Sequence, residues 1–301
     1  MFRMFDCVIV GGGIAGLQAA IQLGRYQHKV VVIDSSDGRS NLCRCYHNVL
    51  GFPNGVSGQE LRNTGRRQAE SLGVHFLKEK VEKVSKRKEG FEFKLSNQQF
   101  VHGKRLLFAT GVKDRIPLLS EIKPCLGISV YVCPDCDGYE IKDKKALILG
   151  SGDVGANMAL TLHYFSKDLT YINHERKPIS ESVKEELENK KIEYVNSPIR
   201  KVITEGSQLK KVMLEDNRVI SANHAFVAFG GNKVNSELAE DLGVELYKNK
   251  HILVDQRKKM TNVEHVWAAG DVVAHSEQVT IAMGDGMQAA IWIHKTLLST
   301  Q

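Results

Sequence analysis

Short apolar runs followed at once by glycine recur along the chain. The first run spans residues 7–10 and is rich in β-branched side chains, which favour a buried strand. Glycines occupy residues 11–13, and apolar residues then return at helical spacing over residues 17–23. A second apolar run, 30–33, ends in Asp34. This order predicts a strand, a glycine turn, a helix, a second strand and an acid.

The glycine loop, residues 11–16, has the spacing Gly-x-Gly-x-x-Gly that is typical of dinucleotide-binding units. Its first glycine allows a tight turn, its second lets backbone N–H groups approach a pyrophosphate, and its third lets the helix pack on the strand. The acid follows the first glycine by 23 positions, where such units bind a ribose. We therefore expect a dinucleotide on residues Gly11, Gly13, Ile14, Ala15, Gly16, Asp34 and Ser35.

The same order of elements recurs in the middle of the chain. An apolar run at 146–149 precedes a second glycine loop, a helical pattern and another apolar run at 169–172. A meander of short strands follows each unit, at 81–100 and at 192–219. The duplication predicts an α/β fold with two doubly wound, three-layer (ββα-type) nucleotide-binding domains. The second dinucleotide would lie on Gly150, Gly152, Asp153, Val154 and Gly155.

One more apolar run, at 266–269, ends in Gly270 and Asp271 and precedes a predicted helix over residues 279–298. An acid at the carboxyl end of a parallel strand can hold a ribityl hydroxyl or a water that bridges to phosphate. We expect Asp271 to belong to the first nucleotide site.

The composition excludes several classes of protein. The chain has 41 Lys and Arg against 35 Asp and Glu, and this excess of +6 is too dispersed to indicate nucleic-acid binding. No apolar run approaches the roughly 18 residues of a membrane span, and no cleavable signal stands at the start. We expect a cytoplasmic protein without a nucleic-acid or membrane partner.

Six cysteines without a signal sequence indicate redox chemistry or a metal site rather than a framework of disulfides. Cys133 and Cys136 have the Cys-x-x-Cys spacing of a reversible disulfide, and Asp137 could move protons to and from the second sulfur. Zinc held by these two thiols with Cys43 and Cys45 is the alternative, but Cys-x-Cys spacing is unusual for structural zinc. We expect no metal.

Taken together, these motifs make the chain resemble the low-molecular-weight thioredoxin reductase family, from Gly11 to the C-terminal helix. The resemblance also includes the segment 47–53, the Ala-Thr-Gly at 109–111, the Cys-x-x-Cys-Asp-Gly motif, and Gln278 after the last Gly-Asp pair. It implies an FAD domain in two pieces, 1–113 and 234–301, with an NAD(P) domain inserted at 114–233. It also implies a homodimer and a swing of the inserted domain.

The resemblance assigns roles to the redox motif. Cys136 would take electrons from the flavin, Cys133 would attack the substrate disulfide, and Asp137 would act as acid and base. The substrate would be thioredoxin, a thioredoxin-like protein or a small disulfide or dithiol. Further contacts to FAD would come from Asn41, Asn48, Val81, Thr110, Gly111, Gly270, Asp271, Gln278 and Val279.

Two departures from the family pattern leave the electron donor open. Reductases that use NADPH have a His-Arg-Arg motif after the second unit's strand, whereas this chain has Asn173, His174 and Glu175. A carboxylate there would repel a 2′-phosphate, although Arg176 follows, so NADPH and NADH both remain candidates with Glu175 and Arg176 as contacts. Glu277 also replaces the arginine that usually precedes the glutamine.

These departures fit a second family with a similar fold and cysteine pair, the gliotoxin-type dithiol oxidases. Those enzymes pass electrons from a small dithiol through the flavin to oxygen and do not need NAD(P)H. Asp137 favours the reductase, since the oxidases tend to have histidine at that position. Two further features stay open: a thiol relay or isolated thiols at Cys43 and Cys45, and a flavin contact or a structural role for His47.

Overall fold

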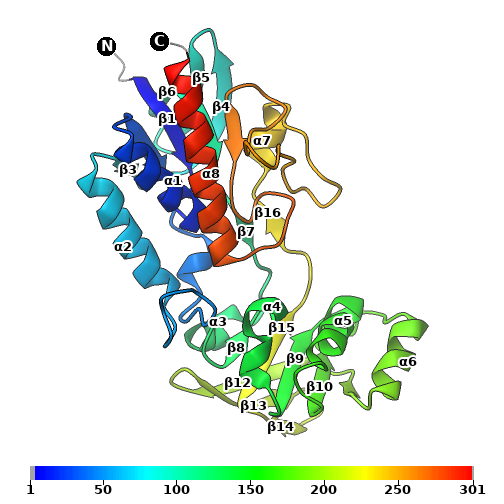
Figure 1. Ribbon diagram of the computed structural model, residues 1–301. Coiled ribbons are helices and arrows are strands. Elements are labelled where there is room, and N and C mark those ends of the chain that lie inside the picture. The colour runs from blue at the N-terminus through cyan, green and yellow to red at the C-terminus, as the bar shows by residue number, and fades with distance from the viewer. Residues whose placement is uncertain (1–3, 300–301) are drawn as a thin grey trace. The chain divides into compact units, whose positions relative to one another are not determined.

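The computed structural model describes residues 4–299, and contacts divide these residues into two units (Figure 1). The loop 42–58 packs with the second unit, although it lies between segments of the first unit in sequence. The predicted domain boundaries, at 113/114 and 233/234, stay a prediction. The first unit contains residues 4–41, 59–113 and 233–299, and the second contains residues 42–58 and 114–232.

The first unit is built on a sheet with the strand order β3-β2-β1-β6-β5-β4. The strands β3, β2, β1 and β6 are parallel, and β17 adds to β6 in parallel beyond the stretch that pairs with β5. The strands β4 and β5 form the antiparallel meander that the sequence predicts at 81–100. The bounds are β1 Met4–Val10, β2 Val30–Ile33, β3 His75–Leu77, β4 Val81–Arg87, β5 Gly90–Leu95, β6 Phe100–Phe108 and β17 Val266–Ala268.

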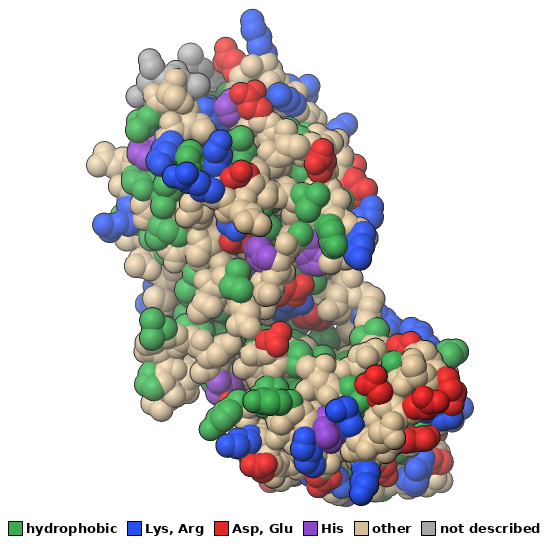
Figure 2. All heavy atoms as spheres, turned by 45° about the vertical axis from the view of Figure 1, so that its right-hand side comes forward, with side chains coloured by type: hydrophobic (Ala, Val, Ile, Leu, Met, Phe, Trp, Pro, Cys, Tyr) green, Lys and Arg blue, Asp and Glu red, His purple; other side chains and the backbone are tan. Residues whose placement is uncertain are grey.

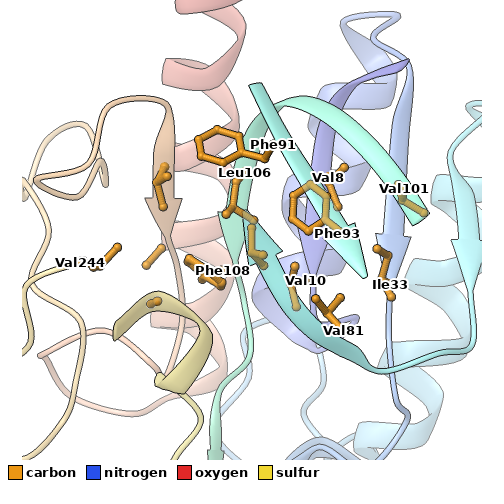
Figure 3. Close-up of a cluster of buried hydrophobic side chains, with 14 of the residues drawn as sticks. Val8, Val10, Ile33, Val81, Phe91, Phe93, Val101, Leu106, Phe108 and Val244 are labelled. Atoms are coloured by element: carbon orange, nitrogen blue, oxygen red, sulfur yellow. The ribbon is translucent and has the colours of Figure 1, made fainter. Parts of the chain in front are cut away.

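Both faces of this sheet are buried, because alternate side chains of each strand enter different cores. In β1, Cys7 and Ile9 face a core with the helices α1 (Ile14–Arg25) and α8 (Val279–Leu298). Val8 and Val10 face the opposite core, which contains the aromatic side chains of the meander (Figure 3). Two covered faces make three layers, as predicted. The remaining elements are η1 Arg39–Asn41, α2 Gly58–Ser71, β7 Val112–Lys113, β16 Lys233–Val234 and α7 Glu237–Asp241.

The second unit repeats this plan with a parallel sheet of order β11-β10-β9-β15-β8. Its meander, β12 to β14, forms a separate antiparallel sheet. Leu147 and Leu149 of β9 enter one core, and Ala146 and Ile148 enter the other. The strands are β8 Val130–Tyr131, β9 Ala146–Gly150, β10 Leu169–Asn173, β11 Glu193–Val195, β12 Ile199–Glu205, β13 Gln208–Leu214, β14 Val219–Ser221 and β15 His224–Ala228. The helices are α3 Leu119–Ile122, η2 Lys123–Cys125, α4 Pro134–Asp137, η3 Gly138–Ile141, α5 Gly152–Leu162 and α6 Glu181–Asn189.

The predicted fold class is therefore confirmed as α/β with two parallel, doubly wound sheets. Acidic and basic side chains are interspersed on the face that Figure 2 shows, rather than gathered in one basic patch. Among the residues that the structure describes, no helix combines the length and the apolar character needed to cross a membrane.

Candidate active site

The first glycine loop joins β1 to α1 and is shaped by close backbone contacts. Gly11 has a φ of +105°, and a Cβ there would lie 2.2 Å from the carbonyl oxygen of Ala109. A Cβ on Gly16 would lie 2.0 Å from the carbonyl oxygen of Gly11. A Cβ on Gly13 would meet no described atom within 4 Å. The loop is thus closely packed at Gly11 and Gly16 and open at Gly13, beside the N-terminus of α1. Open space next to backbone N–H groups at a helix N-terminus is the environment that a pyrophosphate needs.

Several predicted residues follow the carboxyl ends of neighbouring parallel strands at one edge of this sheet. Thr110 and Gly111 follow β6, and Gly270 and Asp271 follow β17. A Cβ on Gly270 would lie 2.8 Å from the Cβ of Ala15, so the last strand ends against the first glycine loop. Parallel α/β sheets bind their ligands at this edge.

Asp34 follows β2 and accepts three hydrogen bonds, one of them from the Ser36 hydroxyl to Oδ2 at 3.4 Å. The Gly12 N–H donates to its Oδ1 at 3.1 Å, and Arg62 Nη2 on α2 donates to its Oδ2 at 2.7 Å. Arg62 is buried and was missed from the sequence, because α2 has a strongly polar pattern and the pair depends on how α2 packs. A fixed carboxylate beside the glycine loop fits the chemistry of a ribose acceptor.

Asp271 belongs to a charged network that the sequence did not predict. Arg39 Nη1 lies 3.1 Å from Asp271 Oδ2 and 2.5 Å from Glu277 Oε2. The other oxygen of Glu277, Oε1, lies 3.2 Å from His251 Nε2. Glu277, which replaces the family's usual arginine, is thus matched by an arginine from another segment of the same unit.

The other residues predicted to contact FAD lie at several separate positions. Thr110 and Gly111 are clamped by hydrogen bonds to Asn235, and Gln278 is the N-cap of α8. Val81 is buried in the meander core, so only its backbone is available to a ligand. Asn48 lies in the loop that packs with the second unit. Ser35 and Asn41 flank the exposed turn after Asp34, and Val279 begins α8.

The second glycine loop joins β9 to α5 and is equally tight. A Cβ on Gly155 would lie 2.4 Å from the ring of Tyr171, whose hydroxyl donates to the carbonyl oxygen of Gly152. Asp153 accepts a hydrogen bond from the Ser180 N–H at 2.8 Å, and Val154 is exposed at the start of α5. The loop thus offers a helix N-terminus and close backbone, as the first loop does.

The loop after β10 carries the residues predicted to distinguish NADPH from NADH. The carboxylate of Glu175 accepts hydrogen bonds from Arg115 and lies 3.0 Å from Lys177 Nζ. Arg176 has a φ of +53° and lies 3.7 Å from a carboxylate oxygen of Glu215. Glu175 and Arg176, which the sequence paired as contacts for one nucleotide, therefore engage different partners.

The cysteine pair spans the short helix α4. Cys133 is the N-cap of this helix, and its Sγ accepts a hydrogen bond from the Cys136 N–H at 3.2 Å. Hydrogen bonds from the Cys136 thiol and N–H lower the pKa of Cys133, while donation to Cys133, together with burial, raises the pKa of Cys136. In the reduced pair, Cys133 therefore becomes the thiolate and Cys136 keeps the proton.

Asp137 directly follows the second cysteine and is buried. Burial raises its pKa to about 6, whereas His47 opposes this shift and Glu140 adds to it. His47 Nδ1 lies 3.7 Å from Asp137 Oδ1 and 3.9 Å from Glu140 Oε1. A carboxyl with a pKa near neutrality can both accept and return a proton, which suits a general acid and base.

The other thiols have the properties of packing residues. Burial raises the pKa of Cys43 to about 12 and also raises the pKa values of Cys45, Cys125 and Cys7. The Sγ of Cys43 faces the carbonyl oxygen of Cys45 at 3.2 Å. Raised pKa values disfavour the thiolates that a relay through Cys43 and Cys45 would need. In the part of the chain that the structure describes, no three His, Cys, Asp or Glu side chains gather as metal ligands would.

Known proteins with similar sequences match this chain over nearly its whole length. A thioredoxin reductase of Aquifex aeolicus is 27% identical over 305 residues, covering 98% of this chain and 94% of that protein. The structure of thioredoxin reductase from Giardia duodenalis is 25% identical, with a TM-score of 0.82 over 98% of this chain and 99% of that chain. The crystal structure of HlmI is 25% identical, with a TM-score of 0.87 over 99% and 95% of the two chains.

The family model described as pyridine nucleotide-disulphide oxidoreductase matches residues 5–286. This range includes both glycine loops and the cysteine pair on α4. The chain therefore belongs to the pyridine nucleotide-disulphide oxidoreductase family, and within it resembles the thioredoxin reductases.

Proposed function

We propose that the chain is a flavin-dependent dithiol/disulfide oxidoreductase. Electrons would pass from NAD(P)H through FAD and the Cys133–Cys136 pair to a disulfide, on a thioredoxin-like protein or a small molecule. Family membership supports the reaction class, and the Aquifex aeolicus relative is named for the reduction of thioredoxin. The homodimer implied by the family resemblance stays a prediction.

The main support for this proposal is the arrangement of two thiols and one carboxyl at the helix α4. Cys133 is stabilised as the thiolate, Cys136 is its hydrogen-bond donor, and Asp137 is a buried carboxyl with a pKa of about 6. A nucleophilic thiolate, a second thiol that can resolve a mixed disulfide and a group that exchanges protons are what disulfide reduction needs.

In the proposed reaction the Cys133 thiolate attacks one sulfur of the substrate disulfide, and the other sulfur leaves as a thiolate that takes a proton from solvent. Asp137 takes the proton of Cys136, whose sulfur then attacks Cys133 Sγ and releases the second substrate sulfur as a thiolate, which solvent also protonates. The pair ends as a disulfide, so it has lost the two electrons that the substrate gained. Asp137 returns its proton when the pair is reduced again.

The residues of each glycine loop fit the dinucleotide assigned to it. On the first unit, the open space at Gly13 and the fixed carboxylate of Asp34 fit the pyrophosphate and ribose of FAD. On the second unit, the loop from Gly150 to Gly155 fits a nicotinamide dinucleotide. FAD would supply the two-electron chemistry that links hydride transfer to disulfide reduction.

Anaerobic mixing of the purified flavoprotein with NADH, NADPH or a simple dithiol tests the proposal. We expect a reduced nicotinamide to bleach the flavin and to drive disulfide turnover. Cys136→Ser should abolish turnover while flavin stays bound, and Cys125→Ser, at a buried thiol with a raised pKa, is the matched control. Bleaching by the dithiol alone in this mixing, together with oxygen uptake when the dithiol is added in air, would favour the dithiol oxidase instead.

A further inference from the structure

The two glycine loops of this chain allow an internal comparison of their ribose sites. In the first unit, Asp34 lies 23 residues after Gly11, and its carboxylate accepts a hydrogen bond from the Gly12 N–H. In the second unit, the residue 23 positions after Gly150 is Asn173. The strand registers agree, because the residue before each first glycine has an equivalent partner: Val10 pairs with Ile33, and Leu149 pairs with Ile172. The acid of the first site is therefore an amide in the second.

Asn173 is fully buried, and its side chain is used to hold the loop. Its Oδ1 accepts from the Gly152 N–H at 3.1 Å, and its Nδ2 donates to the Lys177 carbonyl oxygen at 2.8 Å and to the Tyr194 hydroxyl oxygen at 3.1 Å. These bonds occupy both ends of the amide within the protein. Asn173 thus cannot replace Asp34 as a ribose acceptor.

Glu175 has the surroundings that such an acceptor needs. The loop after β10 lies against the glycine loop, since a Cβ on Gly152 would be 3.2 Å from both Lys177 Cβ and the Pro178 carbonyl oxygen. The hydrogen bond from Arg115, with help from Lys177 and from Ser151 of the glycine loop, lowers the pKa of Glu175 to about 2. Its carboxylate is partly exposed and ionised, and it belongs to the loop that lies against the second glycine loop.

Each of the three cations beside this carboxylate faces one of two acids. Arg115 and Lys177 both pair with Glu175, and Arg176 faces Glu215. His174 adds no positive charge, because its Nδ1 accepts a hydrogen bond from the Ile199 N–H at 2.8 Å and burial lowers its pKa. A 2′-phosphate would meet an ionised carboxylate here, whereas a 2′-hydroxyl could donate to it.

We propose that the second unit selects NADH over NADPH, with Glu175 accepting a hydrogen bond from the adenosine ribose and repelling a 2′-phosphate. This inference rests on the proposed function, because it assumes that the second loop binds a nicotinamide dinucleotide. It names Glu175 as the residue that determines the specificity.

Isothermal titration calorimetry of the flavin-loaded protein with NAD⁺ and with NADP⁺ tests this proposal without turnover. We expect NAD⁺ to bind at least about tenfold more tightly. Glu175→Gln should narrow this ratio severalfold, and Glu175→Arg should reverse it. Glu205→Gln removes the same charge from an exposed ion pair with Lys210 elsewhere in the second unit and should leave the ratio unchanged.

Tighter binding of NADP⁺ by the unaltered protein, no binding of either nucleotide, or a ratio that Glu175→Gln does not change would overturn the inference. Flavin bleaching separates these results from failure of the proposed function. If NADP⁺ binds more tightly and NADPH bleaches the flavin, the inference fails and the oxidoreductase stands. If NAD⁺ binds more tightly but only a dithiol bleaches the flavin, the inference stands and the reductase reaction fails.

Discussion

At the scale of single residues, we expect the protonation of Asp137 to decide whether Cys136 can lose its proton. Burial alone would keep this carboxyl protonated over a wide pH range, and His47 opposes that effect while Glu140 adds to it. The pKa of about 6 lies above the value of 3.8 for an exposed aspartate. Its burial therefore favours the folded state most at low pH, and this contribution is lost as the pH rises through about 6.

We expect His47→Gln and Glu140→Gln to move the pH dependence of disulfide reduction in opposite directions. Asp137 must be ionised to accept the Cys136 proton, so release of the second substrate thiol should become faster as the pH rises through about 6. Without His47 the pKa of Asp137 rises, and the increase in rate should move to higher pH. Without Glu140 it should move to lower pH.

Single-turnover reduction of a disulfide by the pre-reduced protein, followed from pH 5 to 8, would measure this effect. Cys133 is common to all three proteins, so a difference between their profiles reports on Asp137. Identical profiles in the unaltered protein and both variants would exclude Asp137 as the group that His47 and Glu140 influence.

At the scale of elements, each of the two strand-loop-helix units places close-packed backbone at the N-terminus of a helix. The glycines of the first loop have different tasks, and alanine substitutions separate them. A Cβ on Gly16 would clash with the Gly11 carbonyl oxygen, whereas a Cβ on Gly13 would extend into open space. We therefore expect Gly16 to be needed for the fold and Gly13 to be needed for ligand binding.

We expect Gly16→Ala to destabilise the flavin-free protein by about 3 kcal/mol, since backbone must shift to admit the methyl group. Gly13→Ala should leave the melting temperature of the flavin-free protein unchanged and weaken FAD binding at least about tenfold. Thermal unfolding and flavin titration of both variants measure these effects. A stable Gly13→Ala protein that keeps its flavin at full affinity would place the pyrophosphate elsewhere.

Elements with a strong local signal could be predicted from the sequence, and contacts between distant segments could not. Both glycine loops have their signal within a few residues, and the C-terminal helix spans the predicted residues Val279–Leu298. By contrast, Arg39 lies 232 positions from Asp271, and the pairing of His47 with Asp137 needs a loop to pack with the second unit. No periodicity marks such pairs, because they form only when elements pack.

At the scale of the whole molecule, the proposed redox path is divided between two units of the same design. We assign FAD to the first unit, and the dithiol and the nicotinamide dinucleotide to the second. Such a protein can hold electrons in two places, two on the flavin and two on the cysteine pair. Its capacity for electrons therefore reports directly on whether flavin and dithiol act together.

The most direct test is an anaerobic titration of the oxidised flavoprotein with a measured reductant, followed by flavin absorbance and by the count of free thiols. We expect the unaltered protein to accept four electrons per chain and to gain two thiols, whereas Cys136→Ser should accept two electrons and gain none. A capacity of two electrons in both proteins, with no new thiols, would contradict electron transfer between the flavin and the Cys133–Cys136 pair.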